Sequence, residues 1–187
     1  MPFIKSDAHH ILSERNLSLR CKRIADYWLS IWDGDECPAR DAVTPAPIKD
    51  LLPGLIFFQV VPDRSVTVRM AGTDFLNLLK FELTGSDWLA VTPLQDRDER
   101  LTVFSRVARG NIAFSRWTFS HYWQGETSCE KLLLPLRARP GTEGIPILGF
   151  VDWPAAGIQP DDQPSLAAIP PPQILDLAFF TKGGRIC

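Results

Sequence analysis

A long hairpin predicted in the second half of the chain carries large apolar side chains on both faces, and this feature constrains the fold most. Residues 112–123 and 127–138 have the aromatic and β-branched composition of strands, and they flank Gln124-Gly125-Glu126, a short loop with a central glycine. A sheet with one face in water would alternate apolar and polar residues. We therefore expect a cover on each face. The apolar side chains of one face are Phe114, Leu132, Leu134 and Leu136.

The loop also suggests a register for this hairpin. If Trp123 faces Thr127, His121 lies opposite Cys129. The same alignment places Phe119 opposite Lys131, Trp117 opposite Leu133 and Ser120 opposite Glu130.

One cover is a helix predicted over residues 17–33, which Gly34 ends. Its apolar residues recur at intervals of four and three, which places them on one stripe. The stripe either packs on the chain's own domain or forms a dimer, although two heptads are fewer than a coiled coil needs. Residues 1–15 are polar and mixed, and we expect them to be frayed. The candidate dimerisation residues are Leu17, Cys21, Ile24, Trp28 and Ile31.

The rest of the core alternates strands and short helices. Thr44 and Pro45 favour a short helix to Leu52, and strands 55–61 and 65–70 follow, with Thr67 and Arg69 on one face. Three helical pieces come next, and they can cover the other face of the sheet. The last has Thr92 and Gln95 as a capping box, an apolar stripe of Leu94, Leu101, Phe104 and Val107/Ala108, and Gly110 at its end. With a strand at 145–153, the order is ββ, helices, βββ.

The last part of the chain differs in composition. Residues 169–173 are Ile-Pro-Pro-Pro-Gln, which cannot pair inside a sheet and should be extended. Leu175 to Phe180 is apolar again and is expected to dock on the domain or on a partner. We divide the chain into a lead-in and helix (1–35), a core domain (36–153) and a Pro-rich tail (154–187).

Composition excludes several classes of partner. A net charge of −2 and a pI near 5.9 give no basic patch for nucleic acid or an anionic membrane. Arg137 and Arg139 read as a solvated strand end. No apolar run approaches the roughly 20 residues that span a bilayer, and the N-terminus lacks a signal-peptide core. We expect a soluble, cytoplasmic protein whose four cysteines are reduced.

No catalytic or metal-binding constellation is evident. Haem needs an axial ligand, yet His9 and His10 lie in the lead-in and His121 near a hairpin end. His121 with Cys129 is one ligand short of a catalytic zinc site, so a polar cross-strand pair is the simpler interpretation. Residues 71–111 contain no cysteine for a flavin adduct, and no phosphate-binding loop is present. We predict no metal, no cofactor and no enzymatic activity.

Several short motifs occur in a fixed order along residues 24–153. They are Tyr27-Trp28, Pro38-Ala39-Arg40, Thr44-Pro45 to Leu52-Pro53, Val68 to Thr73, Glu82-Leu83-Thr84-Gly85 and Glu130 to Leu136. In this order they resemble an alphaproteobacterial family of stand-alone PAS-like proteins. The resemblance implies an α+β fold: a five-stranded antiparallel sheet with helices on one face and a small pocket between them. In PAS domains that pocket can hold a metabolite, haem or flavin, and the outer sheet face meets a dimer partner or an effector. Here the N-terminal helix would cap that other face or contact a dimer partner.

These observations lead to three hypotheses. The first is a non-enzymatic sensory or adaptor module that homodimerises, signals by contact with an unknown protein, and holds a small metabolite in its pocket. The second is a small enzyme that uses the same pocket, which requires a buried acid or histidine facing a cavity. The third is a purely structural subunit, favoured if Leu175 to Phe180 fills an apolar groove. The candidate ligand-binding residues are Arg69, Thr73, Trp88, Arg116 and Glu130.

Overall fold

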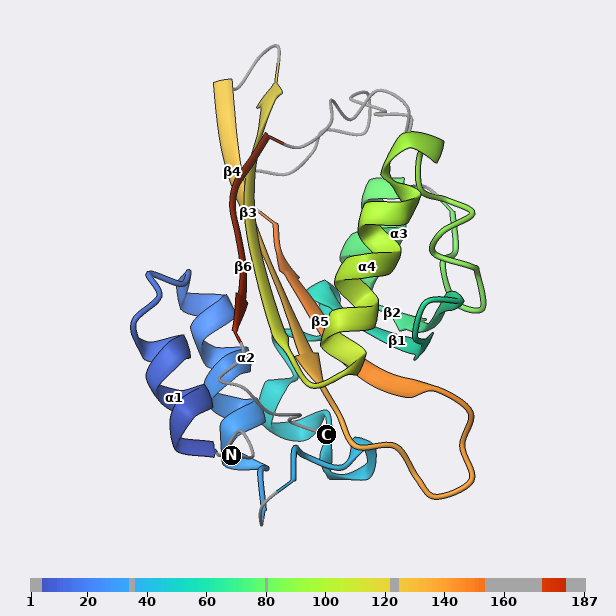
Figure 1. Ribbon diagram of the computed structural model, residues 1–187. Helices are drawn as coiled ribbons and strands as arrows, with labels where there is room; N and C mark the ends of the chain where they lie inside the picture. The colour runs from blue at the N-terminus through green and yellow to red at the C-terminus, as the bar shows by residue number, and fades with distance from the viewer. Residues whose placement is uncertain (1–4, 34–35, 80, 122–124, 154–172, 181–187) are drawn as a thin grey trace.

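A computed structural model describes residues 5–33, 36–79, 81–121, 125–153 and 173–180. An antiparallel sheet lies between two layers of helices (Figure 1). The strand order is β2-β1-β5-β4-β3-β6. The α+β fold with a five-stranded core sheet is confirmed, and a sixth strand joins its edge. The strands are β1 (Leu55–Val61), β2 (Ser65–Ala71), β3 (Ile112–His121), β4 (Gly125–Pro135), β5 (Ile145–Asp152) and β6 (Gln173–Phe180).

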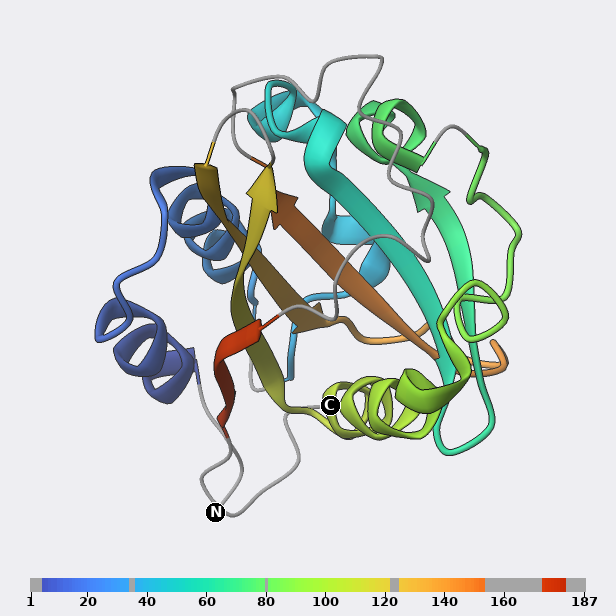
Figure 2. The ribbon, with the colours of Figure 1, turned by 90° about the horizontal axis from the view of Figure 1, so that it is seen from above.

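Helices cover both faces of this sheet, as Figures 1 and 2 show. The outer face, as we name it, lies under α1 (Lys5–Ser13) and α2 (Leu19–Ser30); the inner face lies under α3 (Thr73–Leu79) and α4 (Arg97–Ala108). Two layers are needed because the middle strands bury apolar side chains on both faces. Short 3-10 turns connect these elements at Arg40–Ala42, Ala46–Ile48, Leu52–Gly54 and Leu94–Asp96.

The helix α2 packs on the sheet of its own chain. Cys21, Ile24 and Trp28 are fully buried in the outer core, while Leu17 and Ile31 are half-buried beside it. The indole of Trp28 donates to the carbonyl of Pro135 at 3.0 Å. This favours the intramolecular alternative, so the stripe proposed for dimerisation is largely occupied by the domain's own core.

The predicted fraying of residues 1–15 is wrong for residues 5–13, which form α1. Ala8 and Leu12 are buried in the outer core, and Lys5 donates to the carbonyl of Trp32 at 2.9 Å. Ala8, Ile11 and Leu12 are the apolar residues of this short helix, so most of its stability comes from tertiary packing.

Aromatic side chains fill much of the space between the inner face and its helices. The ring centroids of Phe58 and Phe104 are 4.6 Å apart, and those of Phe58 and Trp88 are 5.5 Å apart. The ring centroids of Phe75, in α3, and Trp153 are 5.8 Å apart. We call this space the interlayer.

Two predicted helix starts are wrong. From Thr44 the chain forms only 3-10 turns, because prolines at 45, 47 and 53 interrupt the helical hydrogen bonds. The Thr92 hydroxyl donates to the carbonyl of Trp88 at 2.7 Å instead of capping, and α4 begins at Arg97 after a 3-10 turn. Leu94 is therefore 77% exposed rather than part of the apolar stripe.

The hairpin β3–β4 has the predicted faces but a different register. Trp117 pairs with Cys129 and His121 with Gly125, so the predicted pairing of His121 with Cys129 is wrong by four residues. β4 already includes Gly125 and Glu126, two residues of the predicted loop. An even shift leaves every side chain on its face, so Phe114 and Leu132 still lie together in the outer core.

The motif residues hold loops to strands. A Cβ on Gly72 would lie 2.2 Å from the carbonyl oxygens of Leu52 and Pro53, so the two motifs require each other. Gly85 has φ +85° and donates to Val68 at 2.7 Å, which fixes the turn against the edge of β2. Tyr27 donates its hydroxyl to Thr44 O at 3.0 Å. These motif residues therefore have a structural role, because they hold loops and turns in place.

The tail contributes β6, which pairs antiparallel with β3. Residues 175–180 therefore dock as a strand on a sheet edge. The predicted extended segment 169–172 lies outside the described residues. Cys37 is disulfide-bonded, so the expectation of four reduced thiols is wrong for this residue; its partner also lies outside the described residues. Within the described ranges, no helix combines the length and apolarity needed to cross a membrane.

Candidate functional site

The five candidate site residues do not form one site. Arg116 and Glu130 contact each other on the outer face, and Trp88 lies in the interlayer. Arg69 lines an open surface depression, and Thr73 is exposed at the start of α3. The structure therefore divides the candidates between two faces of the sheet and its surface.

Arg116 and Glu130 form a buried ion pair that connects the sheet to α2. The two carboxylate oxygens of Glu130 have separate partners: Oε1 accepts from Arg116 Nη2 at 2.6 Å, and Oε2 accepts from the backbone N–H of Ser18 at 2.7 Å. Arg116 also donates to the carbonyl of Asn16 at 2.5 Å. Ser18 is the N-cap of α2, with its hydroxyl accepting from Cys21 N at 3.1 Å. The start of α2 is thus fixed by β3 and β4, and we call this group the clasp.

A second ion pair, beside the clasp, joins α2 to β5. Arg20 of α2 donates to Asp152 at 3.0 Å, and its guanidinium lies 5.4 Å from the ring centroid of Phe150. Asp152 pairs with Glu130 in the sheet register. In these two pairs a charge on the outer face meets an opposite one.

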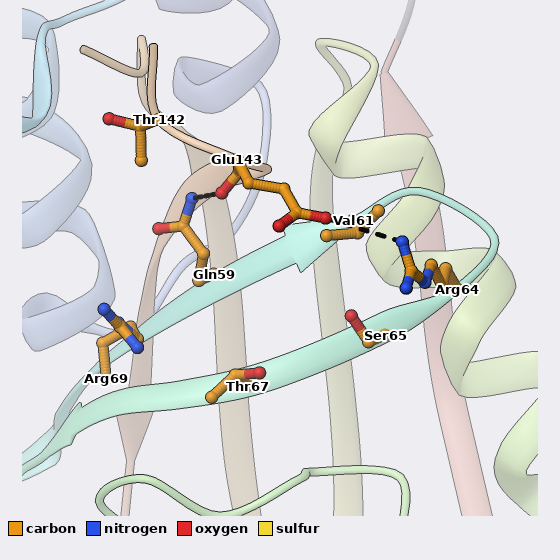
Figure 3. Close-up of a pocket in the computed structure, with 8 residues that line it drawn as sticks. All are labelled: Gln59, Val61, Arg64, Ser65, Thr67, Arg69, Thr142 and Glu143. Atoms are coloured by element: carbon orange, nitrogen blue, oxygen red, sulfur yellow. Dashed lines mark hydrogen bonds and ion pairs between the residues drawn. The ribbon is translucent and has the colours of Figure 1, made fainter.

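Arg69 lies in a polar depression of about 610 Å³ on the outer side of β1 and β2 (Figure 3). Figure 3 shows Thr67 and Arg69 on the same face, as predicted. Gln59 donates to the carbonyl of Glu143 at 2.7 Å, and Arg64 lies 3.5 Å from the Glu143 carboxylate. These groups already pair at the surface, and the depression is open to solvent.

The inner face carries two cations that the sequence analysis did not single out. Lys131 of β4 lies beside Ser115 of β3 and Val151 of β5 in the register, and it is half-buried. Arg100 of α4 is also half-buried, with its guanidinium 5.8 Å from the ring centroid of Trp88. In the described part of the chain neither cation forms an ion pair with a carboxylate.

The environment of these cations disfavours their charge. Burial, and next the Arg100 charge, lower the pKa of Lys131 to about 7. Burial also lowers the pKa of Arg100, against the attraction of Asp96 and Glu99. Both positions could have been inferred from the sequence. Lys131 is two residues from Leu133 and so shares its face of the strand, and Arg100 precedes Phe104 by one helical turn.

The described cysteines and histidines form no reactive pair. Burial raises the pKa of the Cys21 and Cys129 thiols to about 12, so neither is a nucleophile at neutral pH. Gly125, the partner of His121, is four residues from Cys129, or about 13 Å along the strand. Among the described residues no group of three or more His, Cys, Asp or Glu side chains could hold a metal ion.

Comparison with protein families agrees with this architecture. A family model for PAS domains (PAS_5) matches residues 18–151, which include β1 to β4 and nearly all of β5. One matching solved structure is the crystal structure of the PAS domain of an HTR-like protein from Haloarcula marismortui. It is 14% identical and covers 57% of this chain and 88% of that chain, with a TM-score of 0.34. No curated protein matches. From the family match over most of its length, the chain belongs to the PAS_5 family of PAS domains.

Proposed function

We propose that this chain is a non-enzymatic sensory adaptor that binds a small molecule in the interlayer and passes the signal to another protein through α1 and α2. PAS domains are sensory and signalling modules, which supports the general role. The ligand, the output surface and the adaptor role are the parts that we propose.

One observation carries this proposal. Glu130 and Lys131 are consecutive on β4, and successive side chains of a strand point to opposite faces. Glu130 holds the start of α2, while Lys131 faces the interlayer. A ligand that shifts β4 at Lys131 therefore acts directly on the clasp that positions the N-terminal helices.

The enzyme alternative has less support. It needs a buried acid or histidine that faces the interlayer, and Glu130 is the buried carboxylate in the described chain. Its oxygens are engaged by Arg116 and Ser18 on the opposite face. The side chain of His121 lies outside the described residues.

A homodimer, which stays a prediction, would need a different surface from the stripe that the sequence suggested. Since Cys21, Ile24 and Trp28 are buried in the domain, a dimer would use the solvent side of the helices, where Leu19 is 75% exposed. Light scattering of wild type and Leu19→Glu at tens of micromolar tests this form, and a monomer in both removes it. Deleting residues 1–33 would not test it, because the deletion also removes core side chains.

The cytoplasmic location and the lack of nucleic-acid or membrane partners stay predictions. The nearly neutral charge of the chain supports the predicted lack of nucleic-acid and membrane partners. The disulfide at Cys37 is a feature more common in oxidising compartments.

Amide hydrogen exchange tests the proposed relay. We expect Lys131→Met to change protection in residues 19–30, because β4 connects both faces, whereas the exposed Lys49→Met should not. The relay is wrong if both variants match wild type in α1 and α2.

A further inference from the structure

The interlayer near Trp88 has hydrogen-bond donors without acceptors. The indole Nε1 of Trp88 is buried and has no hydrogen-bond partner among the described residues. Neither Lys131 nor Arg100 has a carboxylate partner within the described residues. A buried donor that lacks an acceptor costs stability, and a cation buried without a counter-charge costs more. Such groups are retained where a ligand supplies the missing acceptors.

These three donors come from separate elements that converge on one layer. α4 packs across β4, and Arg100 lies on the same side of α4 as buried Phe104. The guanidinium of Arg100 lies over the Trp88 ring, which in turn contacts Phe58 of β1. Since α4 packs against β3, β4 and β5, Arg100 and Lys131 lie in the same layer, and the Arg100 charge contributes to lowering the pKa of Lys131.

We infer that this part of the interlayer binds a small anion with an aromatic or aliphatic body, held by Lys131 and Arg100 and packed against Trp88. The inference rests on the proposed sensory function and names the class of ligand. A carboxylate provides two acceptor oxygens and one negative charge, which matches an ammonium and a guanidinium. The neighbouring aromatic rings match an apolar body.

Other ligand classes match these groups less well. A cation would meet two like charges. A neutral amide could accept a hydrogen bond from Trp88 but would bring no negative charge to either cation. The charged groups facing Lys131 from the described elements are Arg100 and Glu99 of α4, while β3 and β5 present neutral Ser115 and Val151.

Matched acids and amides test the inference. The probes are phenylacetate and octanoate, their neutral amides, and inorganic phosphate. We expect one of the carboxylates to raise the Tm of wild type by roughly 3–5 °C at about tenfold excess over its Kd, and its amide to have no effect. Lys131→Met and Arg100→Met should each weaken binding about tenfold or more, with Lys49→Met as the exposed control.

Proton uptake gives a readout that a merely structural role would not move. At pH 8 the Lys131 amine of the free protein is mostly neutral, and a bound anion favours its charged form. Calorimetry in buffers of different ionisation enthalpy should show an uptake of nearly one proton per carboxylate bound. Lys131→Met should abolish this uptake, whereas Arg100→Met removes a charge that lowers the pKa of Lys131 and should reduce the uptake without abolishing it.

Three outcomes overturn the anion site. They are equal binding of acid and amide, carboxylate binding that both variants leave unchanged, and no binding of any anion at about 10 mM. Binding of the amides alone would leave the sensory function standing with a neutral ligand. Carboxylate binding without altered hydrogen exchange in α1 and α2 would keep the site and remove the relay.

Discussion

On either side of β4 the two faces of the sheet treat charge in opposite ways. On the outer face Glu130 pairs with Arg116, and Asp152 with Arg20. On the inner face Lys131 and Arg100 have no carboxylate partner in the described chain. Because an unpaired buried charge costs stability whereas a paired one holds its neighbours in place, the outer face is built to fix helices and the inner face is suited to a ligand.

Removing the clasp should give the largest effect. Glu130→Ala leaves Arg116 and the backbone N–H of Ser18 without their acceptor, so we expect a loss of about 3–5 kcal/mol in urea unfolding. The double variant Glu130→Leu/Arg116→Met should recover much of it, because both charges are then gone. The exposed Glu143→Ala is the control, with a change below about 0.5 kcal/mol. If Glu143→Ala lost as much stability as Glu130→Ala, the clasp would be worth no more than a surface ion pair, and this would contradict the contrast between the faces.

The inner face should respond with the opposite sign. Lys131→Met removes a half-buried cation, and we expect a gain of about 2 kcal/mol at pH 7.

This gain should depend on pH. Burial lowers the folded pKa of Lys131 to about 7, whereas the unfolded amine titrates near 10.5. Between these values the unfolded state binds more protons, so the stability of wild type rises with pH. The advantage of Lys131→Met should thus be greatest at or below pH 7 and shrink toward pH 10. An advantage independent of pH would show that Lys131 is not desolvated. The neighbouring charges Asp96, Glu99 and Arg100 are the same in wild type and in Lys131→Met, so the difference between the two proteins reports on Lys131.

Trp28→Phe should have a smaller effect on the outer core. The substitution removes the donor to the Pro135 carbonyl and leaves part of the indole volume empty, which costs about 1–2 kcal/mol. Thermal unfolding measures the loss. A change below about 0.5 kcal/mol would mean that water or a neighbour replaces the indole.

The smallest effect is expected at the surface. Arg139 donates to both carboxylate oxygens of Asp41 at 2.7 Å, but both side chains are exposed. The Arg139 guanidinium lowers the pKa of Asp41, so the interaction is present above the ordinary Asp pKa and is lost in acid. Asp41→Asn should therefore leave the urea midpoint at neutral pH nearly unchanged. A loss as large as that of Glu130→Ala would remove the distinction between buried and surface pairs.

Local patterns predicted the strands better than the helix starts. β1 begins and ends where the apolar run does, since prolines flank it at 53 and 62. The capping box at Thr92 failed because the hydroxyl found the nearer Trp88 carbonyl. The N-terminal helix was missed because its stability comes from packing on α2 and the sheet.

The sequence by itself determined the order of elements, the two apolar faces of β3 and β4, and the membership of Arg116 and Glu130 in one face. Only the tertiary structure decided that these two residues pair, because an even shift in register preserves faces but changes partners. It also decided that Lys131 and Arg100, 31 residues apart in sequence, share one layer. Which charges find an opposite charge depends on contacts between distant segments, and this is what separates the clasp from the proposed anion site.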